Sequence, residues 1–208
     1  FITASTTHLT TFALLGVTEG KKGNWGNEIT QDTVGQYIPE RSANIDLKAE
    51  ISAIKFYSKI ARKLVKTPYW PIIHFVAYGT AESDNLSVAE RQGVITDFKE
   101  LYAKLPSTNE DWKIIAQMCS GAKPKLNAKL EAKVLKNFIK VYKRLPISGN
   151  DADTQAMAYM AYRLRPASKD ISAETKAIAT FRNIFKVKPT SSVQWAIVRA
   201  IAYSGATR

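Results

Sequence analysis

The residue types that carry out nucleophilic, acid–base or metal chemistry are scarce and widely separated in this sequence. The 208 residues include two histidines, His8 and His74, and one cysteine, Cys119. A zinc site needs a set of Cys and His ligands, and an activated nucleophile needs a base within hydrogen-bonding reach, so this set builds neither. The glycine-rich phosphate-binding motifs are absent from the sequence. We therefore expect no catalytic residue, no cofactor and no metal site, and an enzyme fragment is only a third hypothesis.

The individual candidates each have a structural interpretation. Cys119 lies among apolar residues of a predicted helix, which favours a buried small hydrophobe over a reactive thiol. His74 is interpreted as a surface or boundary residue rather than a base or ligand. Asp151 and Asp153 follow a Gly-Asn pair, which is typical of a solvated turn, and a calcium loop needs more oxygen ligands than these two residues supply.

A row of basic residues is the charged feature with the clearest pattern. Its members recur every three or four residues, which predicts that they share one helix face opposite an apolar stripe. They are Lys129, Lys133, Lys136, Lys140, Lys143 and Arg144. The row is either a solvated helix face or a contact for a polyanion or an acidic neighbouring subunit. Because lysine dominates over arginine, we expect salt-sensitive contact that does not read a base sequence.

The net charge of +12 is unevenly distributed along the chain. Residues 1–46 contain three basic and five acidic residues, whereas the remainder contains 27 basic and 13 acidic residues. An anionic partner is therefore expected for the second part: nucleic acid, anionic lipid or an acidic cell-wall polymer. No apolar run reaches the roughly 20 residues that a membrane-spanning helix needs.

A degenerate repeat predicts the elements that position these residues. Aromatic residues followed by apolar residues occur at positions 57, 98, 138 and 181, with spacings of 41, 40 and 43. A proline lies eight residues after the aromatic in the last three copies, and Val65 takes its place in the first. A second block follows, starting with Trp in three copies and with Thr154 in the other. The aromatics expected to pack between repeats are Tyr57, Trp70, Phe98, Trp112, Phe138, Phe181 and Trp195. The alternative role for them is a shelf on which a ligand stacks.

Helix-ending and helix-starting residues divide each copy into two helices. Pro106, Pro146 and Pro189 end the first helix, because proline lacks the required N–H donor. Thr108 and Ser191 are suited to cap the second helix, and Gly121 to end it. Ser87 with Glu90 has the spacing of a capping box that opens the second copy.

The fold class expected is mainly α. About four degenerate helix-turn-helix repeats with a period of about 41 form a short solenoid or a bundle. The units are expected at about 47–86, 87–125, 126–168 and 169–208. Residues 1–46 are expected to form a short β-strand lead-in and a Gly-rich linker, because β-branched residues there precede a glycine-rich stretch.

The run from Thr7 to Leu14 resembles two kinds of sequence. The tripeptide His8-Leu9-Thr10 is similar to the end of the autoproteolytic domain of adhesion-type receptors, which implies attack by the Thr10 hydroxyl with His8 as base. Similar runs also look like final strands of β-domains in bacterial surface proteins, which implies a plain terminal strand.

The repeat region resembles large bacterial surface proteins and, more faintly, S-layer homology domains. The second block from Trp195 to Gly205 carries the resemblance, together with the shortened motif from Val88 to Arg91 and Glu174. In S-layer homology domains a Trp-bearing helix, a Gly turn and an Arg/Glu-bearing helix bind acidic wall polymer, and this implies a secreted or cell-surface location. The chain begins at Phe1, and we expect a processed product or a segment of a longer precursor.

The function expected first is that of a structural cell-surface protein. It would assemble with copies of itself or other surface proteins into an envelope layer or filament, through repeat and strand contacts. The alternative is a binding module for an anionic polymer, either cell-wall polysaccharide or, less favoured, nucleic acid, through the lysine-rich helix face.

Overall fold

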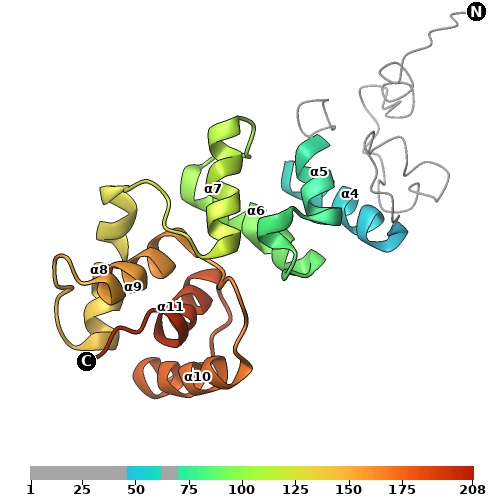
Figure 1. The fold of residues 1–208 in the computed structure, drawn as a ribbon. Coiled ribbons are helices and arrows are strands. Elements are labelled where there is room, and N and C mark those ends of the chain that lie inside the picture. Colours follow the sequence, from blue (N-terminus) through green and yellow to red (C-terminus); the bar gives the residue numbers. More distant parts are fainter. Residues whose placement is uncertain (1–45, 62–69) are drawn as a thin grey trace, which may run out of the picture. The chain divides into compact units, whose positions relative to one another are not determined.

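The protein is mainly helical in the part that the structure describes, as predicted. The computed structural model describes residues 46–61 and 70–208 (Figure 1). Within these ranges the chain forms eight α-helices and one short 3-10 helix, with no β-strand. The strand lead-in predicted for residues 1–46, and with it His8, Leu9 and Thr10, falls almost entirely outside the described ranges. None of the described helices is both long enough and apolar enough to cross a membrane.

Long and short helices alternate along the described chain. The bounds are α4 Leu47–Ala61, α5 Trp70–Tyr78, η2 Ala81–Ser83, α6 Val88–Tyr102, α7 Asn109–Ser120, α8 Ala128–Tyr142, α9 Asp151–Tyr162, α10 Ile171–Phe185 and α11 Ser192–Tyr203. The helices α4, α6, α8 and α10 have 15 residues each. One aromatic side chain lies ten residues after the first residue of each, and all four are at most 1% exposed: Tyr57, Phe98, Phe138 and Phe181.

The chain divides into two compact units, and the first contains α4, α5, η2 and α6 as far as Thr96. The two helices α4 and α5 pack against each other around buried Ile54, Tyr57 and Ile73. The buried guanidinium of Arg91 closes the end of α5, because it donates hydrogen bonds to the carbonyls of Val76 and Ala77 at 3.0 and 2.8 Å. These carbonyls belong to the last turn of the helix, which leaves them without intrahelical donors.

The second unit comprises residues 97–104 and 108–208. Here α8 packs against α9, α9 against α11, and α11 against α10, so that α9 and α11 lie between the two longer helices (Figure 1). The helix α9 is buried from Ala158 to Tyr162, which agrees with its inner position. Longer and partly exposed helices therefore present the outward faces of this unit.

Most of the capping residues predicted from the sequence are found at the helix ends. Thr108 caps α7 reciprocally with Asp111, and Ser191 caps α11. The capping box predicted for Ser87 and Glu90 is also confirmed, with N–O distances of 2.8 and 3.3 Å. Gly121 ends α7 in the left-handed conformation, as expected. The helices α8, α9 and α10 instead end on left-handed basic residues, Lys143, Arg163 and Lys186, which the sequence did not predict.

Candidate functional site

The helix α8 separates apolar and basic side chains onto opposite faces. It begins after Asn127, whose side chain accepts a hydrogen bond from the Leu130 N–H at 3.2 Å. Leu130, Val134, Phe138 and Val141 recur every three or four residues and are all buried. An α-helix turns once in 3.6 residues, so a residue one before or two after a buried position lies on the other side of the helix. The lysines of α8 occupy such positions and therefore face outward.

Five lysines form this outward row, which is called the α8 lysine face below. They are Lys129, Lys133, Lys136, Lys140 and Lys143, and all five are exposed. In the described part of the chain, none of the five forms an ion pair. Lys140 Nζ lies 4.5 Å from the centre of the Phe185 ring of α10, a cation–π contact that leaves the ammonium group accessible. The face therefore presents concentrated positive charge to the solvent.

The single carboxylate of α8 is directed away from the lysine face. Glu131 pairs with Lys123 at 3.4 Å and accepts a hydrogen bond from the Tyr162 hydroxyl at 3.1 Å. Its side chain is only 19% exposed. Glu131 thus serves the packing of α8 on α9 and does not neutralise the lysines.

Arg144, which was predicted to belong with the five lysines, instead binds other residues of the second unit. Its two terminal nitrogens donate to the carboxylate oxygens of Asp153 at 2.5 and 2.7 Å, and its Nε donates to the Thr207 carbonyl at 3.1 Å. The hydrogen bonds from Arg144 hold the pKa of Asp153 below its ordinary value, and the Ile147 N–H adds to this effect against the opposing effect of burial. Arg144 is therefore a structural residue at the end of the lysine row.

The aromatics predicted to pack between repeats differ in burial. The four on the longer helices are part of the core, as described above. Trp112 and Trp195 each occupy the fourth position of a 12-residue helix, α7 or α11, and both are half-buried. Thr154 has the same position in α9 and is exposed. Trp70 begins α5, but its side chain is not among those that the structure describes.

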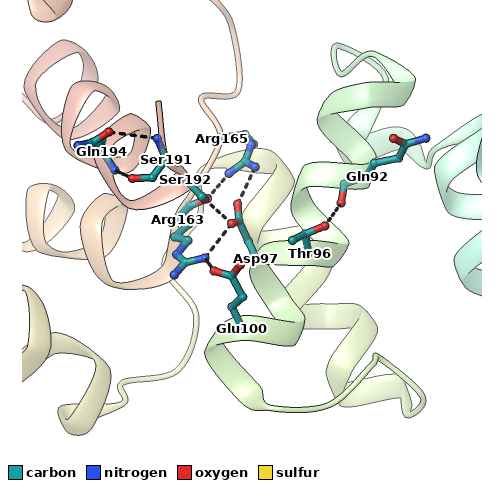
Figure 2. Close-up of polar contacts among 9 residues, drawn as sticks. All are labelled: Gln92, Thr96, Asp97, Glu100, Arg163, Arg165, Ser191, Ser192 and Gln194. Carbon is teal, nitrogen blue, oxygen red and sulfur yellow. Dashed lines mark hydrogen bonds and ion pairs between the residues drawn. The ribbon is translucent and has the colours of Figure 1, made fainter. Parts of the chain in front are cut away.

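A buried ionic cluster, which sequence reasoning missed, joins three segments of the second unit (Figure 2). Asp97 of α6 accepts hydrogen bonds from Arg163 at 2.9 Å and from Arg165 at 2.7 Å, and Ser192 at the start of α11 donates to the same carboxylate. Arg163 also pairs with Glu100 at 2.5 Å. Asp97 and Arg165 are 1% and 5% exposed.

The cluster has a structural role, because its charged groups are used in contacts within the protein and leave few hydrogen-bonding positions for a substrate. The oxygens of Asp97 already accept three donors, and Arg165 donates in addition to the Arg163 carbonyl at 2.5 Å. The backbone N–H of Arg165 donates to the Met118 carbonyl at 2.7 Å. The signal that could have revealed this cluster is the pair of arginines on either side of Leu164, since charged residues so close to an apolar helix end must find partners when buried.

The remaining reactive residue types are dispersed. Cys119 is buried, and the ring of His74 lies 5.2 Å from that of Tyr78 on the same helix. Among the described residues, no group of three or more His, Cys, Asp or Glu side chains is placed to hold a metal ion. The α8 lysine face is therefore the candidate site that the described residues offer.

Comparison of the chain with protein-family models, with curated proteins and with solved structures found no match.

Proposed function

We propose that residues 47–208 are four copies of one helix pair, with a period of about 41 residues. The longer helices begin at Leu47, Val88, Ala128 and Ile171, which gives spacings of 41, 40 and 43. A recurring side-chain contact supports the proposal. The tyrosine that ends the shorter helix bonds to a glutamate at the fourth position of the longer helix, in the pairs Tyr78–Glu50, Tyr162–Glu131 and Tyr203–Glu174. If the helix pairs descend from one ancestral unit, the same contact is expected at matching positions, and it occurs in three of them.

We further propose that the protein is non-enzymatic and uses these helices as a rigid support for binding an extended array of negative charge. The observation that carries this proposal is the α8 lysine face. Lys143 follows Lys129 by 14 residues, which corresponds to about 21 Å along a helix axis. An anionic partner of that length could contact every lysine at once. A location at the cell surface or outside the cell remains part of the proposal.

The residue types of the α8 lysine face favour contact without sequence reading. A lysine ammonium is a strongly hydrated point charge, whereas base or planar anion recognition uses the paired donors of arginine. The outward positions of α8 also carry no aromatic side chain on which bases could stack. Binding should therefore depend on charge density and fall steeply with salt.

A charge-neutralising variant tests the proposal. Lys133→Gln, Lys136→Gln and Lys140→Gln are combined, and binding to random-sequence duplex DNA, used as a model polyanion, is followed by fluorescence anisotropy between about 50 and 200 mM salt. The slope of log K against log salt should be about −4.5 for the parent, with five lysine contacts, and about −1.8 for the variant, with two. The control combines Lys176→Gln, Lys186→Gln and Lys188→Gln, three exposed lysines on or after α10. Equal loss in both variants, or in neither, would reject a specific role for α8.

Self-assembly is a second candidate, supported by apolar side chains on the last helix pair. Ile171 and Val193 are 70% and 39% exposed, and Val187 between the two helices is 49% exposed. In a repeat array such positions would be covered by a further unit. Electron microscopy of the concentrated protein would show ordered filaments or sheets if this is correct, and Ile171→Ser with Val193→Ser should disperse them. Monomers at both low and physiological salt would reject it.

A further inference from the structure

We infer that the anionic partner of the α8 lysine face is the surface of a lipid membrane with anionic headgroups. The inference rests on the proposed function and adds a second observation to it, which is the group of exposed apolar side chains at the end of the lysine row. Ile139, Leu145 and Ile147 are 38%, 64% and 57% exposed. All three lie within nine residues of each other, among and just beyond the last lysines.

Ile139 belongs to the same side of α8 as the lysines next to it. It follows Lys136 by three residues and precedes Lys143 by four, and residues at these spacings are neighbours on a helix surface. One apolar side chain, Ile139, therefore lies among the lysines near the C-terminal end of this face. At a membrane interface, lysines remain among the headgroups while neighbouring apolar side chains enter the acyl boundary.

The loop after α8 holds Leu145 and Ile147 out of the core although its backbone is firmly anchored. The Ile147 N–H donates to Asp153 at 2.8 Å, and Arg144, which pairs with Asp153, also donates to the Leu145 carbonyl at 3.1 Å. A loop fixed by three such contacts presents its apolar side chains at little further cost in conformational entropy.

A membrane surface accounts for both kinds of side chain, whereas a soluble polyanion accounts for only one. A polysaccharide or a nucleic acid backbone gains from the lysines but offers no apolar phase for Leu145 and Ile147. Anionic headgroups attract the lysines, and the acyl boundary removes the apolar side chains from water. Asp151, the exposed carboxylate that begins α9, offsets only part of the charge of five lysines.

The test measures binding of the whole chain to vesicles by co-sedimentation. Vesicles with about 30% phosphatidylglycerol in phosphatidylcholine are compared with pure phosphatidylcholine vesicles. Binding should require the anionic lipid. Leu145→Ser combined with Ile147→Ser should lower the vesicle partition coefficient about tenfold while leaving the affinity for duplex DNA unchanged. The variant with Lys133, Lys136 and Lys140 changed to Gln should lower both, and each lysine should contribute about fivefold on vesicles.

The outcomes separate this inference from the proposed function. Ile171→Ser is the matched control, an exposed apolar side chain on α10 whose loss should leave vesicle binding unchanged. DNA binding without vesicle binding would overturn the lipid inference and leave the proposed function standing. Vesicle binding that is unaffected by the loss of Leu145 and Ile147 would also overturn it, since charge alone would then suffice. Binding to neither would overturn both, provided that circular dichroism and urea unfolding show each variant to be folded.

Discussion

Arg144 and Asp153 form a paired contact in which two guanidinium nitrogens meet two carboxylate oxygens, at 2.5 and 2.7 Å. The carboxylate is 1% exposed, and it also accepts the backbone N–H of Ile147. Because Asp153 lies in the first turn of α9 and Arg144 two residues after the end of α8, the pair closes the connection between the two helices. The same contact orients the loop that bears Leu145 and Ile147.

The Arg144–Asp153 pair should make the protein sensitive to acid. Hydrogen bonds from Arg144 lower the pKa of Asp153 in the folded state, so in acid the unfolded chain binds a proton more readily than the folded one. Stability is therefore fully present above the ordinary aspartate pKa of about 4 and is lost as the pH falls through the lower folded value. Urea unfolding at a series of pH values from 7 to about 2 measures this loss.

The variant Asp153→Asn should reduce both the stability at neutral pH and its decline in acid. The loss at neutral pH should be about 2 kcal/mol, because a buried, charge-assisted set of hydrogen bonds is weakened. Asp151→Asn is the control, since Asp151 is exposed two residues earlier in the same helix turn. A pH profile of Asp153→Asn that coincides in shape with the parent would contradict the assignment.

The buried cluster around Asp97 should be more important for stability than any surface ion pair. Asp97→Asn would leave the buried guanidinium of Arg165 without its anionic partner, and breaking such a pair costs about 3–5 kcal/mol. Glu100→Gln also removes an ion pair with Arg163, but the Glu100 side chain is 55% exposed, so the cost should be below about 1 kcal/mol. Urea unfolding of the two variants measures the difference. Equal losses of unfolding free energy would show that the burial of Asp97 does not increase the contribution of its ion pairs to stability.

Local signals in the sequence explain why the helical character and several helix caps could be predicted. The aromatics at 57, 98, 138 and 181 occupy one helix position in four helices, and the pattern depends only on the apolar face that each helix must bury. Caps such as Thr108 and Ser191 are equally local, since a side chain satisfies a backbone donor three residues away. These features require no knowledge of which helices meet.

The contacts that sequence reasoning missed are those between distant segments. Asp97 meets Arg163 and Arg165 across more than 60 residues, and no spacing in the sequence relates them. Arg144 was grouped with the five lysines because its position continues their row, yet Asp153 binds it after the chain reverses into α9. A helix-face pattern predicts the face of the helix from which a side chain projects, whereas the partner of that side chain depends on tertiary packing.

Two tyrosines should make the protein sensitive to alkali. Burial raises the pKa of Tyr162 to about 12, and the nearby Glu131 carboxylate adds to the shift against the Asn127 N–H. Burial likewise raises the pKa of Tyr203 to about 12, with Glu174 beside it. An unfolded tyrosine ionises near the ordinary value of 10.0, so above that pH the unfolded state releases protons that the folded state retains. Stability should therefore fall as the pH rises from about 10 to about 12.

Ultraviolet absorbance of phenolate separates these two tyrosines from more exposed ones in a pH titration. Tyr162→Phe should remove one late-titrating group and flatten the alkaline decline in urea stability, because phenylalanine has no proton to release. A titration in which all tyrosines ionise together near the ordinary value, while circular dichroism still reports folded protein, would contradict the burial of these hydroxyls.

Gly121 should tolerate a methyl group far less well than Gly149, although both have the same backbone conformation. Their φ angles are +76° and +78°, a region that costs an L-residue about 1–2 kcal/mol. A Cβ atom on Gly121 would lie 2.9 Å from the Arg165 carbonyl oxygen, whereas one on Gly149 would meet nothing within 4 Å. The conformational cost is therefore shared, and only Gly121→Ala adds a collision with the backbone.

The collision at Gly121 cannot be relieved cheaply, because both sides of the contact are held. The Gly121 carbonyl accepts a hydrogen bond from Gln155 at 2.9 Å, and the Arg165 N–H is bound to the Met118 carbonyl. Gly121→Ala should accordingly lower the free energy of unfolding by at least about 1 kcal/mol more than Gly149→Ala, as urea denaturation would measure. Equal losses would mean that the segment after α9 can move away from the end of α7. The Asp97 cluster, which fixes that segment through Arg165, would then tolerate displacement as well.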